Sequence, residues 1–202
     1  MEKVRRCFWA GVAVGALAAL VVLGVGFSVL FVVVLPFVGP RFAARTDPLR
    51  AVEGQRAFDF ELEDVNPASP TVGRRVRLAE TLGDRGAVVN FMASWCPPCL
   101  EELPVLHKIE AEKAARIVFV AAWEGEGGGR DALVKLAKAE ALTSPILFAT
   151  EAEDEELRHH YPHETIPTTY LVGQDQVIRR VLRGAHSDSE FRREIDQAFG
   201  GK

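Results

Sequence analysis

The chain has 202 residues, and its 24 lysine and arginine residues against 28 aspartate and glutamate residues give a formal net charge of −4 at pH 7. Without residues 1–40 the net charge is −6, because three of the basic residues and one of the acidic residues lie there. This balance argues against a nucleic-acid binder, in which clustered lysine and arginine neutralise phosphates. The length allows one complete domain and one further segment.

The further segment is an apolar N-terminal span. From Phe8 to Val38 no residue is charged, which makes roughly 30 positions where about 20 suffice to cross a bilayer. The sequence around its end offers no convincing small-x-small site for a signal peptidase, so we interpret residues 8–38 as an uncleaved transmembrane anchor. Residues 1–7 would form a cytoplasmic tail, and residues 39–53, which contain two prolines, a linker.

Basic residues lie on both sides of the anchor. Those before it favour a cytoplasmic N-terminus by the positive-inside rule, but those after it weaken the bias, so charge alone does not determine the topology. The residues concerned are Lys3, Arg5, Arg6, Arg41, Arg45 and Arg50.

Residues 54–202 are predicted to form one α/β domain. Phe58, Phe60 and Leu62 alternate with acidic residues, which predicts a strand with one buried face. Residues Arg75–Leu78 alternate again after a proline-containing loop, so the two segments are expected to pair as an N-terminal hairpin.

The rest of this domain alternates between apolar runs and helical periodicity. The runs predict strands, and the order β-α-β-α-β-β-α after the hairpin predicts an α/β sandwich around a mixed sheet. The predicted strands are Ala87–Met92, Ile117–Ala122, Ile146–Phe148, Thr168–Val172 and Val177–Leu182. The predicted helices are Pro97–Ala115, Asp131–Ala141, Glu151–His160, which we expect to be exposed, and one from about Ser187, with Asp188 or Ser189 as its cap.

The motif Trp95-Cys96-Pro97-Pro98-Cys99 joins a predicted buried strand to a predicted helix. If the helix starts at Cys96, Cys99 lies one turn further on the same face, within reach of a disulfide. Unpaired N–H groups and the positive dipole end of the helix would favour a thiolate at Cys96. We therefore predict a redox-active pair, with Cys96 as nucleophile and Cys99 as resolving thiol.

Cysteine usage leaves the compartment open. After residue 40 only Cys96 and Cys99 occur, which fits either a cytosolic redox enzyme or an exported domain that avoids stray thiols. The third cysteine, Cys7, lies at the edge of the predicted anchor. It lacks the residues expected before a lipid-modified cysteine, so we interpret it as a small apolar residue, with reversible acylation as the alternative.

Three segments and the anchor together carry a family resemblance. Gly54–Leu62 (GQRAFDFEL), Val88–Pro104 (VVNFMASWCPPCLEELP) and Ile166–Val172 (IPTTYLV) resemble the TlpA-like, membrane-anchored thiol-disulfide reductases of the bacterial periplasm, which have the thioredoxin fold. The group includes the reductases that serve cytochrome c maturation. The resemblance covers roughly residues 54–199 and the anchor, and this conjunction of motifs is specific where a lone C-x-x-C is not.

The resemblance implies a thioredoxin-like mixed sheet flanked by helices, preceded by one transmembrane helix. It further implies a single-pass protein of the bacterial inner membrane whose redox domain faces the periplasm. Such a protein receives electrons from a membrane donor and reduces disulfides in exported proteins, such as apocytochrome c. The cysteine pair needs no further cofactor for this chemistry.

The resemblance also implies roles for single residues near the substrate. Pro167 would be a cis-proline that faces the cysteine pair, and the backbone of Ile166 would hold an extended substrate. Trp95, Pro97 and Pro98, which flank the cysteines, would complete the substrate-binding surface.

A carboxylate is a candidate proton partner for the pair. Glu102 matches an acidic residue that lies near the cysteines in relatives, and its spacing from Cys99 puts it on the same helix face, with Glu101 rotated away. It could manage the proton of Cys99, and the alternative is a solvated helix carboxylate. Asn90 stands where thioredoxins proper carry a buried aspartate, which increases the weight on Glu102.

The sequence also allows three alternatives to a thiol reductase, each of which is disfavoured. Half of a zinc site is disfavoured, because no second cysteine pair occurs and only histidines remain as further ligands. A copper-site assembly or metal-binding protein is a second alternative, but the thioredoxin-like relatives that deliver copper space their cysteines by three residues. We interpret the cluster of three histidines as solvated loop residues. A non-catalytic binding module would not need both cysteines, Trp95 and Pro167. The histidines are His107, His159, His160, His163 and His186, of which the cluster comprises His159, His160 and His163.

Overall fold

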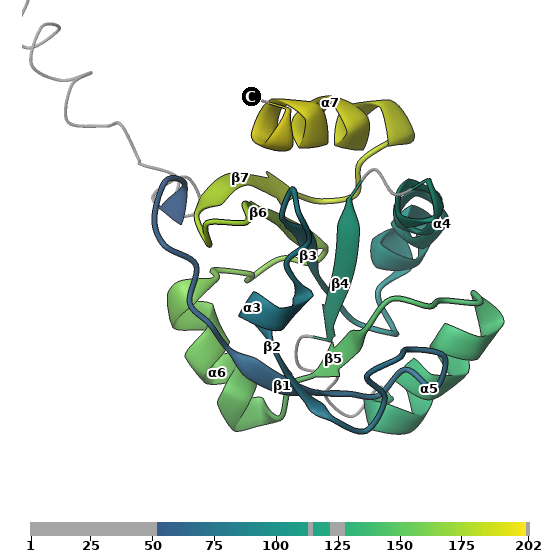
Figure 1. Ribbon diagram of the computed structural model, residues 1–202. Coiled ribbons are helices and arrows are strands. Elements are labelled where there is room, and N and C mark those ends of the chain that lie inside the picture. Colours follow the sequence, from purple (N-terminus) through teal and green to yellow (C-terminus); the bar gives the residue numbers. More distant parts are fainter. Residues whose placement is uncertain (1–51, 113–114, 122–127, 201–202) are drawn as a thin grey trace, which may run out of the picture. The chain divides into compact units, whose positions relative to one another are not determined.

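Figure 1 shows the computed structural model of the chain, in which residues 52–112, 115–121 and 128–200 are described. They belong to Asp47–Lys202, the second of two compact units into which the chain divides. The predicted tail, anchor and most of the predicted linker lie outside the described residues. Within the described ranges, none of the helices combines the length and the apolar character that crossing a membrane requires.

The described strands form one sheet of seven strands in the order β2-β1-β5-β4-β3-β6-β7. β3, β4 and β5 are parallel neighbours, and the remaining pairs are antiparallel. The predicted α/β fold with a mixed sheet is therefore confirmed. The strands are β1 (Glu61–Asp64), β2 (Arg75–Arg77), β3 (Ala87–Met92), β4 (Arg116–Ala121), β5 (Ile146–Phe148), β6 (Thr168–Val172) and β7 (Ile178–Arg183).

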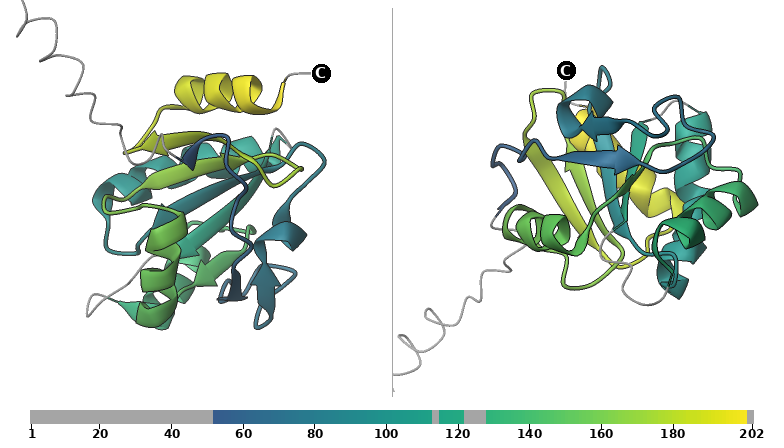
Figure 2. Two further views of the ribbon diagram at one scale, coloured as in Figure 1. Left: turned by 90° about the vertical axis from the view of Figure 1, so that its left-hand side faces the viewer. Right: turned by 90° about the horizontal axis from the view of Figure 1, so that it is seen from below.

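Helices cover both faces of this sheet (Figure 2). Successive residues of β3 point to opposite faces, so Val88 and Met92 pack in the core that includes α4, α5 and α7. Val89 and Phe91 pack in the second core, together with α6 and the hairpin. The helices are α3 (Leu78–Thr81), α4 (Pro97–Ala111), α5 (Gly129–Ala139), α6 (Glu151–His160) and α7 (Asp188–Phe199).

The predicted N-terminal hairpin is present and extends the sheet at one edge. β1 pairs antiparallel with β2, with Leu62 opposite Val76, and also pairs antiparallel with β5. The strand begins at Glu61, later than the alternating pattern predicted, although Phe60 and Leu62 are buried as expected. The buried carboxylate of Asp64 ties this edge together, because it accepts hydrogen bonds from the backbone of Ile146 and from the hairpin loop.

The N-cap of the last helix, α7, differs from the one predicted. Ser187 is the N-cap of α7, where the sequence predicted Asp188 or Ser189. Its hydroxyl accepts from the backbone N–H of Glu190, whose carboxylate accepts from the backbone N–H of Ser187. Ser187, Asp188 and Ser189 are all residue types that can act as an N-cap. Only Ser187 has a glutamate three residues later, which completes the reciprocal pair. Phe191, one turn further, is buried as predicted.

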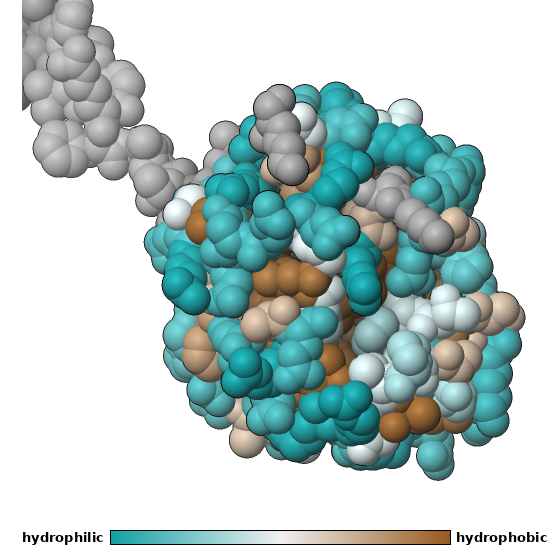
Figure 3. Space-filling view, in the orientation of Figure 1, coloured by the Kyte–Doolittle hydropathy of each residue, from teal (hydrophilic) through white to brown (hydrophobic). Residues whose placement is uncertain are grey.

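The surface is largely polar on the face drawn in Figure 3, where apolar atoms show mainly in hollows between hydrophilic residues. Among the described residues, the large apolar side chains classed as exposed are Val72, on the hairpin loop, and Trp95, beside the cysteine pair. An exposed tryptophan next to a reactive motif is a candidate contact for a partner.

Candidate active site

Cys96 and Cys99 form a disulfide at the N-terminus of α4, with an S–S distance of 2.12 Å and a Cα–Cα distance of 5.3 Å. Cys96 is the N-cap residue, and its Sγ accepts the backbone N–H of Cys99 at 3.3 Å. Pro97 occupies the first helical turn, where a missing N–H costs nothing. The predicted pair and helix start are confirmed, and the sulfur of Cys96 lies where helix N–H groups stabilise negative charge.

The pair is nearly buried while its neighbours in sequence are exposed. Cys96 is 3% exposed and Cys99 1%, whereas Trp95 is 49% exposed. Pro97 and Pro98 also lie at the surface. A partner that reaches the sulfurs therefore meets these three side chains first.

The second wall of the site is the loop that leads into β6. The Ile166–Pro167 peptide bond is cis, as expected, and the carbonyl oxygen of Ile166 lies 3.8 Å from Sγ of Cys96. The antiparallel pairing of β3 with β6 brings these segments together across 70 residues of sequence. Pro167 itself is buried, and its carbonyl accepts a hydrogen bond from the backbone N–H of Gly184.

Glu102 lies one turn beyond Cys99 and is only 2% exposed, so the alternative of a solvated helix carboxylate is wrong. Its Oε1 accepts a 2.6 Å hydrogen bond from the side-chain amide of Asn90, and its Oε2 accepts from the backbone N–H of His186 at 3.1 Å. Burial raises the pKa of Glu102 to about 7, against the two hydrogen bonds, which lower it. Glu101, as expected, is exposed.

Two members of the hydrogen-bond network around this carboxylate were absent from the sequence-based prediction. Thr169 stands opposite Asn90 in the β3–β6 pairing, and its hydroxyl accepts the second hydrogen bond of the Asn90 amide at 2.8 Å. His186 contributes a backbone group, and a backbone N–H in a loop carries no sequence signal. Glu102 is thereby linked to β3, β6 and the loop before α7.

The interpretation of the three clustered histidines as solvated is wrong for His163. His159 and His160 are exposed at the end of α6, and His160 stacks on Phe58 with a centroid distance of 3.9 Å. His163 is only 2% exposed, and both of its ring nitrogens are engaged within the protein. Across the part of the chain that the structure describes, no group of three or more histidine, cysteine, aspartate or glutamate side chains is arranged to hold a metal ion.

The fold and this site define a thioredoxin-like thiol-disulfide oxidoreductase with one Cys-x-x-Cys pair. The family profile of the AhpC/TSA family matches residues 53–181, and the chain belongs to that family.

Named relatives agree with this class. The thiol-disulfide oxidoreductase ResA of Bacillus subtilis is 28% identical over 138 residues, which cover 68% of this chain and 70% of that protein. ResA of Halalkalibacterium halodurans is 28% identical over 193 residues, 93% of this chain and 92% of that protein. The crystal structure of StoA from Bacillus subtilis superposes with a TM-score of 0.54 at 22% identity, covering 68% of this chain and 96% of that one, and so shows the fold.

Proposed function

We propose that this chain is a single-pass protein of the bacterial inner membrane that reduces disulfides in exported proteins on the periplasmic side. The observation that carries the proposal is the placement of Cys96 Sγ at the start of α4, 3.8 Å from the carbonyl of Ile166. A nucleophilic sulfur and a backbone acceptor for an extended peptide thus face each other.

The reaction divides into two exchanges. In the reduced protein, the Cys96 thiolate attacks one sulfur of the substrate disulfide, and the other substrate sulfur leaves as a thiolate that takes up a proton. Cys99 then loses its proton and attacks Cys96, which closes the Cys96–Cys99 bond and releases the second substrate sulfur. Two electrons pass from the protein to the substrate, and a membrane electron donor restores the dithiol.

Glu102 is the proposed acceptor of the Cys99 proton. A carboxyl group with a pKa of about 7 holds and releases a proton near neutral pH, where an ordinary glutamate stays ionised. Its position one turn from Cys99 on α4 supports this role. Asn90 and His186 orient this carboxyl group through their hydrogen bonds to its two oxygens.

The membrane and periplasmic parts of the proposal rest on the sequence. Residues 8–38 are long and apolar enough for an anchor, and the match to ResA of Halalkalibacterium halodurans covers 93% of the chain, so it extends into that span. Apocytochrome c is the proposed substrate class, from the resemblance to the cytochrome c maturation reductases. The copper-site alternative is not retained, because Cys96 and Cys99 are separated by two residues and both ring nitrogens of His163 are engaged within the protein.

Trapping of mixed disulfides tests the function. The full chain carrying Cys99→Ala, expressed in bacterial cells, should accumulate exported proteins linked to Cys96 by a disulfide, because the resolving thiol is missing. The matched Cys96→Ala variant should trap none of them. Partners confined to the cytoplasm would overturn the location, and equal trapping by the two variants would overturn the assignment of the nucleophile.

The direction of electron flow needs a second measurement. Equilibration of the purified full chain with a redox buffer should give a potential near the reducing value of about −270 mV that is typical of thioredoxin. A value near about −120 mV, typical of strong oxidants, would overturn the role as a reductant. Stoichiometric zinc in the purified protein would overturn the thiol chemistry altogether.

A further inference from the structure

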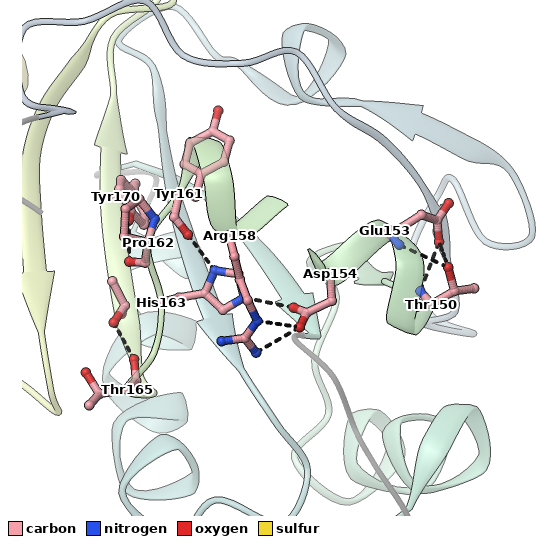
Figure 4. A network of polar contacts seen from close by, with 10 residues as sticks. Thr150, Glu153, Asp154, Arg158, Tyr161, Pro162, His163, Thr165 and Tyr170 are labelled. Atoms are coloured by element: carbon pink, nitrogen blue, oxygen red, sulfur yellow. Dashed lines mark hydrogen bonds and ion pairs between the residues drawn. The ribbon is translucent and has the colours of Figure 1, made fainter. Parts of the chain in front are cut away.

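His163 is a buried ionisable residue that the proposed reaction does not use. It follows α6 and precedes the cis bond at Pro167 by four residues. Its Nδ1 lies 2.5 Å from the carbonyl oxygen of Tyr161, and its Nε2 lies 2.8 Å from Oδ1 of Asp154 in α6 (Figure 4). Both contacts hold the ring in one orientation, stacked on Phe91 of β3 at a centroid distance of 4.4 Å.

The geometry requires a proton on each ring nitrogen. A carbonyl oxygen and a carboxylate oxygen are both acceptors, so each nitrogen of His163 must donate. Burial alone would raise the pKa of Asp154, but hydrogen bonds from His163 and Arg158 outweigh it and hold that pKa below its ordinary value. An ionised Asp154 thus faces a charged imidazolium, with the guanidinium of Arg158 on its other oxygen.

The aromatic side chains around His163 add no charge. Phe91 on β3 is apolar, and burial raises the pKa of Tyr161 and Tyr170 well above the usual range, so both phenols stay neutral. Glu164, the next residue along the chain, is exposed. The ion pair between His163 and Asp154 is therefore the charged contact on which this part of the chain depends.

The loop that His163 holds is the one that presents Ile166 to the cysteine pair. Among the described residues, the backbone of Pro162–Ile166 makes no hydrogen bond to another backbone group. Side chains fix it instead. Tyr170 donates to the carbonyl of Pro162 (Figure 4), and Thr168 donates to the carbonyl of Thr165. His163 lies between these two attachments, and it is the member of the set that carries a charge.

We propose that His163, protonated at both ring nitrogens and paired with Asp154, is a positioning residue that sets the backbone of Ile166 for binding an extended substrate. This rests on the proposed function, in which the substrate lies along Ile166 beside Cys96. His163 touches neither the substrate nor the sulfurs. It acts through the two residues that separate it from Ile166, because a loop without backbone hydrogen bonds follows its side-chain attachments.

The test compares a substrate whose peptide backbone the loop can bind with a substrate that has no peptide backbone. One is an unstructured peptide with an intramolecular disulfide, and the other is 5,5′-dithiobis(2-nitrobenzoate), which has no peptide backbone. His163→Phe keeps an aromatic ring against Phe91 and removes both hydrogen bonds. In the full chain, KM for the peptide should rise about tenfold, the effect of losing about one hydrogen bond.

The same variant should reduce the small disulfide at the wild-type rate and keep the wild-type reduction potential, because the sulfurs are untouched. His159→Phe, on the exposed end of α6, is the matched control. It should change neither KM for the peptide nor the rate of reduction of the small disulfide. Asp154→Asn supplies a milder second variant, since it keeps an oxygen for the ring but removes the charge. It should also raise KM for the peptide, by a smaller factor than His163→Phe does.

The outcomes separate this inference from the function on which it rests. Equal losses with both substrates in His163→Phe and Asp154→Asn would overturn it, because they would mark a general loss of structure. An unchanged KM for the peptide in both variants would also overturn it. A wild-type protein that reduces the small disulfide but not the peptide would overturn the proposed function, and this inference with it.

Discussion

The side-chain amide of Asn90 in β3 donates one hydrogen bond of 2.6 Å to Glu102 in α4 and a second of 2.8 Å to Thr169 in β6. An asparagine amide has two N–H donors on one nitrogen, and both are used here. Asn90 cannot itself carry a proton away. It therefore stabilises and orients the one ionisable member of this group, Glu102, one helical turn from Cys99.

Replacing Glu102 by glutamine should change how stability depends on pH. In the oxidised fold the pKa of Glu102 is about 7, above its ordinary value of 4.5, so the folded state binds the proton more tightly than the unfolded state. That contribution is complete below pH 4.5 and is lost as pH rises towards 7, by up to about 3 kcal/mol. Glu102→Gln cannot ionise and should lack this loss.

Denaturant unfolding of the oxidised protein at pH 5 and pH 8 measures this difference. The wild-type free energy of unfolding should fall more between the two pH values than that of Glu102→Gln. Identical pH dependence in the two proteins would show that Glu102 ionises with its ordinary pKa. Glu101→Gln, on the exposed side of α4, is the control and should follow the wild type.

Replacing Asn90 by alanine should raise the pKa of Glu102 further. The Asn90 hydrogen bond favours the charged carboxylate, and its loss should move the pKa up by about one unit, equivalent to about 1.4 kcal/mol. A pH titration of the Glu102 carboxyl carbon by NMR reads this directly. Thr169→Val leaves the bond to Glu102 in place and should shift the pKa less; a downward shift in Asn90→Ala would contradict the assigned contact.

Replacing Asp64 by alanine should destabilise the domain by about 3 kcal/mol, because it leaves buried donors without an acceptor. Those donors are the backbone N–H groups of Asn66 and Ile146 and the hydroxyl of Thr71. The adjacent Glu63 offers a matched control. Its ion pair with Arg130 is partly exposed, so Glu63→Ala should cost about 0.5 kcal/mol. Equal free energies of unfolding in the two variants would contradict the role given to Asp64.

Replacing Trp95 by alanine should impair protein substrates selectively. The side chain is 49% exposed, so stability should change by less than about 0.5 kcal/mol. A protein disulfide should be reduced with kcat/KM lowered about tenfold, because an exposed aromatic contact is lost, while a small disulfide is reduced as before. Val72→Ala removes the comparably exposed side chain on the hairpin loop and should change neither rate. Loss of both activities in Trp95→Ala would show that the tryptophan shapes the disulfide itself.

The local features of this protein were determined by the sequence alone. The spacing of Cys96 and Cys99, after an apolar strand and before a helix with proline in its first turn, leaves little freedom in where the sulfurs lie. Alternating and continuous apolar runs likewise predicted the hairpin and the buried central strands, because burial on one or two faces sets those patterns. These signals depend on residues that are near one another in the chain.

Tertiary structure decided the environment of the ionisable groups. The sequence left Glu102 open between a solvated carboxylate and a proton partner, and it placed His163 in solvent. Burial follows from packing: β3 and β6 bring Asn90 and Thr169 to Glu102, and α6 brings Asp154 to His163. A pKa depends on desolvation and on charges within a few ångströms. Those neighbours come from 9 to 84 residues away in sequence, so no local pattern could reveal them.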